Sequence, residues 1–485
     1  MIEKRDENNA AKSHGNGDDD GYGYGHVVVV PYPSQGHINP LLQFAKRLAS
    51  KGIKATLATT KNTISSISSI SFLPNVAVEP ISDGYDDGAY PQAGSEDVFL
   101  NSFKSNGSKT LARLIETHQN SSSPVTCVVY DAFLPWALDV AKEYGLLGAA
   151  FFTNSASVCA IFSCVSRGLI NLPLKPDQVR CALPKMPLFK GNDLPSFLRK
   201  PESYPAYLAM KLSQFTNLHL ADYVFCNSFQ DLESEVIEGV IDKWPAKLIG
   251  PMVPSSYLDG RIEGDISYGS SLWKPLSEKC KEWLQSKPTK SVIYISFGSM
   301  VSLTQEQMEE IALALKESNY YFLWVVRESQ ISKLPKEFQA EVSMTNKGMI
   351  VTWCNQLEIL AHEATACFVT HCGWNSTLEG LSLGIPMIGV PQWSDQLPDA
   401  KFIEEVWGVG IWPKEDEKGV IRKENLRDCF KEIMEGKKSR EIRENALKWR
   451  ELSKKAVNYG GSSDNHIEDF VQHLRCTSCA SKNKF

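Results

Sequence analysis

The chain has 485 residues, of which 42% are hydrophobic and 22% are charged, and its net charge is −6 at pH 7. These values are typical of globular proteins, and a chain of this length is expected to form two domains of roughly 200 residues each. The acidic balance and the lack of a basic block argue against nucleic acid as a partner. The sequence has no stretch of about 18 or more apolar residues, so no membrane span is predicted.

The N-terminal residues are polar and rich in Gly, Asp and Asn, which predicts a disordered extension over residues 1–25. This extension lacks the apolar core of a secretory signal, so we expect a cytoplasmic protein, with a monomer as the simplest state. The twelve Cys residues are scattered, mostly in apolar runs, and are predicted to be reduced core residues. The single Cys-x-x-Cys pair, Cys476 and Cys479, stands alone in a polar segment, which disfavours a zinc or redox role.

The first regular element follows the extension. Val27–Val30 is a continuous β-branched run, typical of a strand buried on both faces of a parallel sheet. A turn with Pro and Gly comes next, and apolar residues then recur at helical spacing between Leu41 and Leu48. With a strand predicted over 53–59, this is a βαβ unit. The same pattern predicts a helix over 136–144 and further strands over 126–130, 149–153 and 223–227.

A second series of strands and helices fills the rest of the chain. Residues 251–275 are rich in Pro, Gly and Ser and are predicted to be a linker. Short apolar strands are then expected over 291–296, 322–326, 349–352, 367–370 and 386–390. The resulting fold class is α/β, with two doubly wound Rossmann-like domains, 26–250 and 276–459, facing a central cleft. An amphipathic helix over 460–475 is expected to pack back on the first domain, and 476–485 is expected to be a tail.

A polar loop in the second half has the features of a phosphate site. His371–Ser376 follows a predicted strand and opens a helix at about Ser376, so free N–H groups and a positive dipole end are expected there. The loop has no acidic side chain, so it does not resemble a metal cage. Glu379, one helical turn further along the same face, would suit a ribose diol.

Other residues of this segment suit the remaining parts of a nucleotide sugar. Asp395 and Gln396 are adjacent polar residues after a strand end and can hold sugar hydroxyls through paired hydrogen bonds. Trp353 offers a flat face for a base.

A candidate catalytic pair lies in the first half. His37 follows Gly36 in the turn after the first strand, and imidazole is suited to take up a proton near neutral pH. Such a base needs an orienting partner, and Asp131 ends a neighbouring strand, where a carboxylate would be costly unless it is paired. We therefore expect His37 to deprotonate an acceptor that displaces the leaving group directly.

The segment 353–396 resembles the donor-binding signature box of plant family-1 secondary-metabolite UDP-glycosyltransferases, which have the GT-B fold. The resemblance rests on Trp353-Cys-Asn-Gln356, His371-Cys-Gly-Trp-Asn-Ser376 and Pro391-Gln-Trp-Ser-Asp-Gln396. It implies that Trp353 and the backbone of Cys354 hold uracil, Gln356 and Glu379 the ribose, Ser299, His371, Asn375 and Ser376 the diphosphate, and Trp374, Asp395 and Gln396 the sugar. It also implies a His37–Asp131 dyad. Asn355 departs from the usual Pro, and Gln396 at the last position favours glucose.

The resemblance implies an inverting transfer of glucose from UDP-glucose without metal or other cofactor. The product would be a β-glucoside or glucose ester of a small apolar plant metabolite, such as a terpenoid, steroid, phenolic or flavonoid. Residues 81–88, Ile-Ser-Asp-Gly-Tyr-Asp-Asp-Gly, resemble a subgroup that glucosylates such compounds, small carboxylic acids and thiohydroximates. The candidates for the acceptor pocket, for each of which core packing is an equal alternative, are Phe133, Trp136, Phe151, Phe152, Asn154 and Tyr207.

Two other classes of function fit a fold of this kind. A nicotinamide-dependent oxidoreductase is disfavoured because no Gly-x-Gly-x-x-Gly follows a predicted strand. A nucleotide-sugar-binding protein without turnover would be indicated by an intact donor segment with a broken catalytic pair, but His37 and Asp131 are both present.

Overall fold

The computed structural model describes residues 25–66, 75–86, 92–183, 185–240, 242, 244–269 and 275–482, with side chains up to Thr477. The predicted extension, apart from Gly25, and the side chain of Cys479 lie outside these residues. Within the described part of the chain, no helix combines the length and the hydropathy needed to cross a bilayer.

The N-terminal half forms a seven-stranded sheet in the order β3-β2-β1-β4-β5-β6-β7. All of its paired strands are parallel. The strands are β1 His26–Val30, β2 Lys54–Thr60, β3 Val76–Ile81, β4 Cys127–Asp131, β5 Leu147–Phe152, β6 Tyr223–Cys226 and β7 Lys247–Leu248. The strand order reverses between β1 and β4, and such a switch point opens a crevice at the carboxyl ends of the strands.

Helices cover both faces of this sheet. Val27 and Val29 of β1 pack with α1 on one face, while Val28 and Val30 face the core that contains α3 and α4. This explains the continuous valine run, because both faces of β1 are buried. The helices of this half are α1 Gln35–Ser50, α2 Lys61–Ser66, α3 Glu96–Gln119, α4 Pro135–Glu143, α5 Ala156–Ser166, α6 Pro176–Ala182, α7 Ser196–Arg199, α8 Pro205–Ser213 and α9 Gln230–Val240.

The C-terminal half forms a second parallel sheet, in the order β10-β9-β8-β11-β12-β13. Its strands are β8 Val292–Ser296, β9 Tyr321–Val325, β10 Gly348–Val351, β11 Thr365–Thr370, β12 Met387–Gly389 and β13 Gly410–Ile411. Its helices are α10 Ser277–Gln285, α11 Gln305–Glu317, α12 Lys336–Thr345, α13 Gln356–Ala361, α14 Trp374–Leu383, α15 Gln396–Lys401, α16 Lys423–Glu435 and α17 Ser439–Val457. The predicted fold class, two Rossmann-like α/β units, is confirmed.

The segment predicted as a linker is packed against α1 over much of its length. Asp265, which is buried, accepts hydrogen bonds from Gln43 at 2.5 Å and from Lys46 at 2.8 Å. Asp259 pairs with Arg47 at 3.0 Å. Buried ion pairs therefore fix the connection between the two sheets, although the segment has no apolar period.

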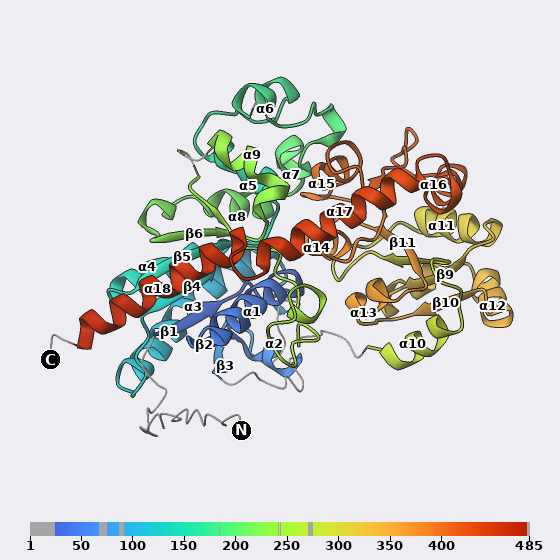
Figure 1. Ribbon diagram of the computed structural model, residues 1–485. Helices are drawn as coiled ribbons and strands as arrows, with labels where there is room; N and C mark the ends of the chain where they lie inside the picture. Colours follow the sequence, from blue (N-terminus) through green and yellow to red (C-terminus); the bar gives the residue numbers. More distant parts are fainter. Residues whose placement is uncertain are drawn as a thin grey trace, which may run out of the picture.

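The chain ends by crossing back to its first half. In Figure 1, α17 and α18 (Ser462–Lys482), drawn in red, run from the C-terminal sheet across to the N-terminal one. Apolar residues of α18, including Phe470, pack against Phe44 of α1 and Phe225 of β6. The helix continues to Lys482 instead of ending at 475 as predicted, because the polar residues after Leu474 include no Gly or Pro to stop it.

Candidate active site

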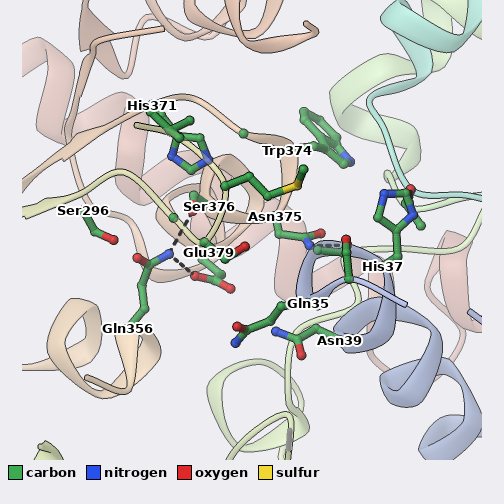
Figure 2. A pocket seen from close by; sticks show the side chains of 18 of the residues that line it. Gln35, His37, Asn39, Ser296, Gln356, His371, Trp374, Asn375, Ser376 and Glu379 are labelled. Atoms are coloured by element: carbon green, nitrogen blue, oxygen red, sulfur yellow. Dashed lines mark hydrogen bonds between the residues drawn. The ribbon is translucent and has the colours of Figure 1, made fainter. Parts of the chain in front are cut away.

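A cleft of about 600 Å³ is lined by residues of both halves of the chain. One wall is formed by the loops that follow β1, β4 and β5 together with α7 and α8, and the other by the loops that follow β8, β10, β11 and β12. Figure 2 shows His37 on one side of this space, with His371, Gln356 and Glu379 on the other. The carboxyl ends of the two sheets thus meet at one site, as expected for open parallel sheets.

His37 and Asp131 form a close pair. His37 lies in the first turn of α1, and Asp131 is the buried last residue of β4. The distance from His37 Nδ1 to Asp131 Oδ2 is 2.6 Å. An ionised carboxylate only accepts hydrogen bonds, so Nδ1 carries the proton and Nε2 is the basic nitrogen. Among the described residues, Nε2 has no hydrogen-bond partner.

Backbone groups hold the carboxylate of this pair. The N–H of Phe133 donates to Asp131 Oδ1 at 3.0 Å, and the N–H of Tyr32 lies 3.4 Å from Oδ2. Thr153 Oγ lies 3.1 Å from His37 Nδ1. These contacts come from the loops after β1, β4 and β5, so three neighbouring strands orient a single imidazole.

The loop before α14 has the geometry of an anion site. The helix begins at Trp374, two residues before the predicted start, because Gly373 already has the extended backbone of an N-cap. The N–H groups of Asn375 and Ser376 therefore fall in the first turn, where helix N–H groups lack intrahelical partners. Negative charge is favoured at such a position.

His371 packs against this loop as a neutral imidazole. Burial lowers its pKa from 6.5 to about 4. A Cβ on Gly373 would lie 2.4 Å from His371 Nε2, and one on Gly298 would lie 2.8 Å from Cε1. Both positions need glycine so that the ring can fit between them. A neutral ring can donate one N–H to a phosphate but adds no positive charge.

A hydrogen-bonded cluster surrounds Glu379. Gln356 donates to Glu379 Oε2 at 2.6 Å and to Ser376 Oγ at 2.9 Å, as the dashed lines in Figure 2 mark. Tyr268 donates its hydroxyl proton to Glu379 Oε1 at 3.0 Å. Burial raises the pKa of Glu379 from 4.5 to about 7. The carboxylate predicted to hold a ribose diol is thus preorganised by two donors.

Trp353 and Cys354 line the cleft in the loop after β10. The next residue, Asn355, has φ −75°, which lies within the range that proline adopts. Its side chain donates to Glu358 at 2.8 Å. Replacing the usual Pro by Asn therefore leaves the course of this turn compatible with the family pattern.

Asp395 and Gln396 line the same cleft at the start of α15. Gln396 Oε1 accepts the backbone N–H of Gln392 at 2.9 Å, which fixes its side chain against its own loop. Asp395 Oδ2 accepts a hydrogen bond from Asn154 Nδ2 at 2.8 Å, across the cleft.

Two further bonds join the halves. Asn375 donates to the carbonyl of Gly36 at 2.6 Å. The indole N–H of Trp374 donates to the carbonyl of Asn227 at 2.7 Å, so this polar atom is not available for the predicted sugar contact.

Ser299 lies in the turn after β8, where it lines the cleft. Its carbonyl accepts a hydrogen bond from the guanidinium of Arg327, which also donates to the carbonyl of Val301. Burial lowers the pKa of Arg327 from its ordinary value. The turn that presents Ser299 is thus held by a residue outside the predicted site.

The acceptor candidates divide into two groups. Phe133, Asn154 and Tyr207 line the cleft. Trp136, Phe151 and Phe152 belong to the core instead, which corrects the prediction. Phe151 and Phe152 lie inside β5, so their side chains point to the two covered faces of the sheet, and Trp136 packs on Phe103 with ring centroids 5.3 Å apart.

Comparisons with known proteins identify the family. Residues 249–455 match the family described as UDP-glucoronosyl and UDP-glucosyl transferase, and residues 26–69 match the glycosyltransferase N-terminal domain. The chain is 50% identical over 453 residues to UDP-glycosyltransferase 74B1 of Arabidopsis thaliana, a match that covers 92% of this chain and 97% of that protein. The chain belongs to the plant family-1 UDP-glycosyltransferases. A second relative of this family, a flavonol 7-O-beta-glucosyltransferase of Arabidopsis thaliana, is 46% identical over 454 residues, covering 93% of this chain and 98% of that protein.

A solved structure extends the similarity to the whole fold. The crystal structure of Os79 from O. sativa in complex with UDP matches with a TM-score of 0.88 at 35% identity, and the match covers 92% of this chain and 100% of that chain. This UDP-glycosyltransferase therefore has the GT-B architecture and is an enzyme that transfers a glycosyl group from a UDP-sugar to a small molecule.

Several residues of the glycosyltransferase cleft were missed from the sequence. Tyr268 lies in the predicted linker, and Arg327, which holds the turn of Ser299 without lining the cleft itself, follows β9, so neither belongs to the signature segment. Phe197, Met210 and Lys211 also line the cleft. A lysine within an apolar run, as at Lys211, was a signal that the sequence did contain.

Proposed function

We propose that this enzyme transfers glucose from UDP-glucose to a hydroxyl or carboxyl group of a small, largely apolar plant metabolite, with inversion at the anomeric carbon and without a metal ion. The observation that carries this proposal is the 2.6 Å contact between His37 Nδ1 and Asp131. It leaves Nε2 of His37 without a partner among the described residues. His37 lines the same cleft as the first turn of α14. A base and an anion site on opposite walls suit a single displacement.

The proposed step moves one proton and one glucosyl group. The acceptor oxygen attacks the anomeric carbon as His37 Nε2 takes the hydroxyl proton, and the bond from that carbon to the UDP oxygen breaks with its electron pair leaving on UDP. Asp131 stabilises the imidazolium that forms. A carboxylate acceptor attacks without giving up a proton. One displacement inverts the α-linked donor and yields a β-glucoside or a glucose ester.

The charge that develops on UDP is met by groups of the protein in this proposal. The free N–H groups in the first turn of α14 and the hydroxyl of Ser376 are fixed donors, and a dipole that is already oriented costs no reorganisation during the reaction. Trp353 and Glu379 are proposed to hold uracil and ribose.

Glucose is the sugar we propose, because Asp395 and Gln396 are adjacent in the cleft and one neighbour fixes each of them. The name of one relative, a flavonol 7-O-beta-glucosyltransferase, supports both the sugar and the anomer. We further propose a monomer in the cytoplasm. Cysteines buried in the core, such as Cys127, Cys226 and Cys367, are free thiols, which supports a reducing compartment.

The test is a panel of acceptors incubated with UDP-glucose, with UDP release, product mass, linkage and anomeric configuration determined by NMR. His37→Ala is the matched control for turnover. A protein that binds UDP-glucose but releases no UDP with any hydroxyl or carboxyl acceptor would instead be a nucleotide-sugar-binding protein. An α-linked product would reject the single displacement.

A further inference from the structure

One lysine on the wall of the cleft that also carries Phe133 and Tyr207 is buried without a carboxylate as ion-pair partner among the described residues. Lys211, on α8, is 4% exposed and lines the cleft. Its ammonium donates to Asn154 Oδ1 at 2.6 Å and lies 4.8 Å from the ring centroid of Phe133 and 5.7 Å from that of Phe162. An amide oxygen and two aromatic faces hold a cation in place without neutralising its charge.

The other buried lysines among the described residues form ion pairs with carboxylates. Three lysines are buried, and Lys46 pairs with Asp265 at 2.8 Å, while Lys401 pairs with Asp193 at 3.0 Å and with Glu405 at 2.6 Å. Lys211 forms no ion pair with any carboxylate of the described residues. A buried charge without a counter-charge is costly, so this arrangement favours an anion that arrives from the cleft.

The surroundings of Lys211 indicate the shape of that anion. Phe197 and Tyr207 stack with ring centroids 5.6 Å apart, and both line the cleft with Met210. The ring of Phe133, which the ammonium contacts, also lies 4.6 Å from the ring of His37. A flat apolar molecule with one acidic group would match an aromatic wall that carries one cation near the base.

We propose that Lys211 is a specificity-determining residue that binds the carboxylate of an acidic acceptor, so that aromatic and other small apolar acids are the preferred acceptor class. This inference rests on the proposed function, since it assigns the acceptor of the same site. Asn154 completes the arrangement, because it accepts from Lys211 and donates to Asp395, which is proposed to hold the sugar.

The test compares two acceptors that differ in charge but hardly in shape, 4-hydroxybenzoate and 4-hydroxybenzamide, both of which offer a phenolic hydroxyl. Wild-type enzyme is expected to have a higher kcat/KM for the acid. Lys211→Met should lower the ratio of the acid's kcat/KM to that of the amide by about 10- to 100-fold, mainly through KM, since a hydrogen bond to a charged group has about this effect. Lys211→Arg should restore part of the preference.

Lys200→Met, at an exposed lysine outside the cleft, is the matched control and should keep the wild-type ratio. Lys211→Gln serves if Lys211→Met does not fold, as judged by its thermal midpoint. A Lys211 that only orients Asn154 would affect both acceptors alike, and equal losses, or no acid preference in the wild type, would overturn the inference. Failure of the proposed function would differ, because neither acceptor would then cause UDP release from bound UDP-glucose.

Discussion

At the scale of single residues, the cleft depends on side chains whose protonation and direction are set by their neighbours. Asp131 is held by backbone N–H groups and in turn orients His37, while Glu379 accepts from Gln356 and Tyr268 in a buried site. In both cases a carboxylate that would be costly in isolation is stabilised by nearby hydrogen-bond donors. The function of each residue can therefore be tested separately by removing one partner.

Substitution of His37 should separate acceptors by their acidity. An alcohol supplies almost no alkoxide at neutral pH, so His37→Ala should lower kcat/KM for an alcohol by about 10²- to 10⁴-fold. A carboxylic acid, with an ordinary pKa near about 4, arrives ionised and should lose much less. Asp131→Asn should give a weaker form of the same pattern, because the base is present but misoriented. Retention of alcohol transfer within a few-fold would remove His37 from the mechanism.

The raised pKa of Glu379 predicts a pH-dependent donor affinity. Burial favours the protonated form below a pKa of about 7, whereas a ribose diol needs the ionised carboxylate as an acceptor. The Kd of UDP-glucose should therefore fall about tenfold from about pH 6 to about pH 8, by proton linkage. The diphosphate of this ligand and His371 do not titrate in that range. Calorimetry of wild type and Glu379→Gln checks this, since the variant should show no such trend.

The raised pKa of Glu379 also predicts how the stability of the ligand-free protein changes with pH. Because the pKa is raised in the folded state, the contribution of Glu379 to stability is present at low pH and is lost as pH rises through about 7. A Glu379→Gln variant whose unfolding free energy varied with pH as the wild type does would contradict this explanation.

At the scale of secondary structure, α14 and α18 have the clearest roles. α14 starts at the cleft, and its first turn follows directly on Gly373, so its unpaired N–H groups face the proposed diphosphate. α18 packs on the face of the N-terminal sheet that α1 covers, where its apolar residues contact α1. α14 therefore contributes to the site through its N-terminus, whereas α18 contributes to the core through its buried face.

The terminus of α14 predicts that turnover persists in excess EDTA. The helix N-terminus and Ser376 are proposed to stabilise the charge of UDP where other enzymes use a divalent cation. Initial rates measured with EDTA and with added Mg²⁺ or Mn²⁺ should agree within error. Loss of activity on chelation, restored by either ion, would show that the anion site is misinterpreted.

The buried face of α18 predicts a large effect of one truncation. Phe470 is fully buried between Phe44 and Phe225, with ring centroids 6.3 Å and 5.1 Å away. Phe470→Ala should lower the free energy of unfolding by about 3–5 kcal/mol, the range for large-to-small changes in cores. Denaturant titration provides the measurement, and Gln472→Ala, at an exposed position of the same helix, is the control.

At the scale of the whole molecule, the site exists because the carboxyl ends of the two parallel sheets face one cleft. Asn375 reaches Gly36, Trp374 reaches Asn227, and Asn154 reaches Asp395. Each of these bonds joins a loop of one half to a loop of the other. The donor loops and the catalytic loop are therefore positioned together, and a change on one wall is expected to affect specificity on the other.

Sugar choice is a property of this combined site. Asp395 is fixed by Asn154 from the opposite wall, so a hydroxyl of the wrong configuration would leave buried polar groups unpaired. UDP-glucose should be used well and UDP-galactose poorly, and Asn154→Ala should reduce the difference. The measurement is kcat/KM for both donors with one acceptor, and equal values in the wild type would refute the assignment.

The sequence by itself determined the local features of this protein. The valine run of β1, the turn before α1, the apolar period of α18 and the contiguous segment 353–396 are all readable within short windows, because strand, turn and helix patterns depend on neighbouring residues. His37 and Asp131 could be paired from the sequence, since His37 follows one strand and Asp131 ends the neighbouring strand of the same parallel sheet. The family and the fold class follow from the same patterns.

Only the tertiary structure decided which side chains share the cleft. Lys211, Asn154 and Asp395 are far apart in the chain, and nothing in their local sequences links them. Tyr268 reaches Glu379 only because buried ion pairs hold the connecting segment on α1. The sequence could not show whether Phe151 and Phe152 belong to the core or line the cleft. A side chain inside a strand points to one face of the sheet, whereas a side chain in the following loop can point into the cleft, so the answer depends on where β5 ends. Contacts between distant segments depend on how the whole chain packs, and no short window of sequence contains that information.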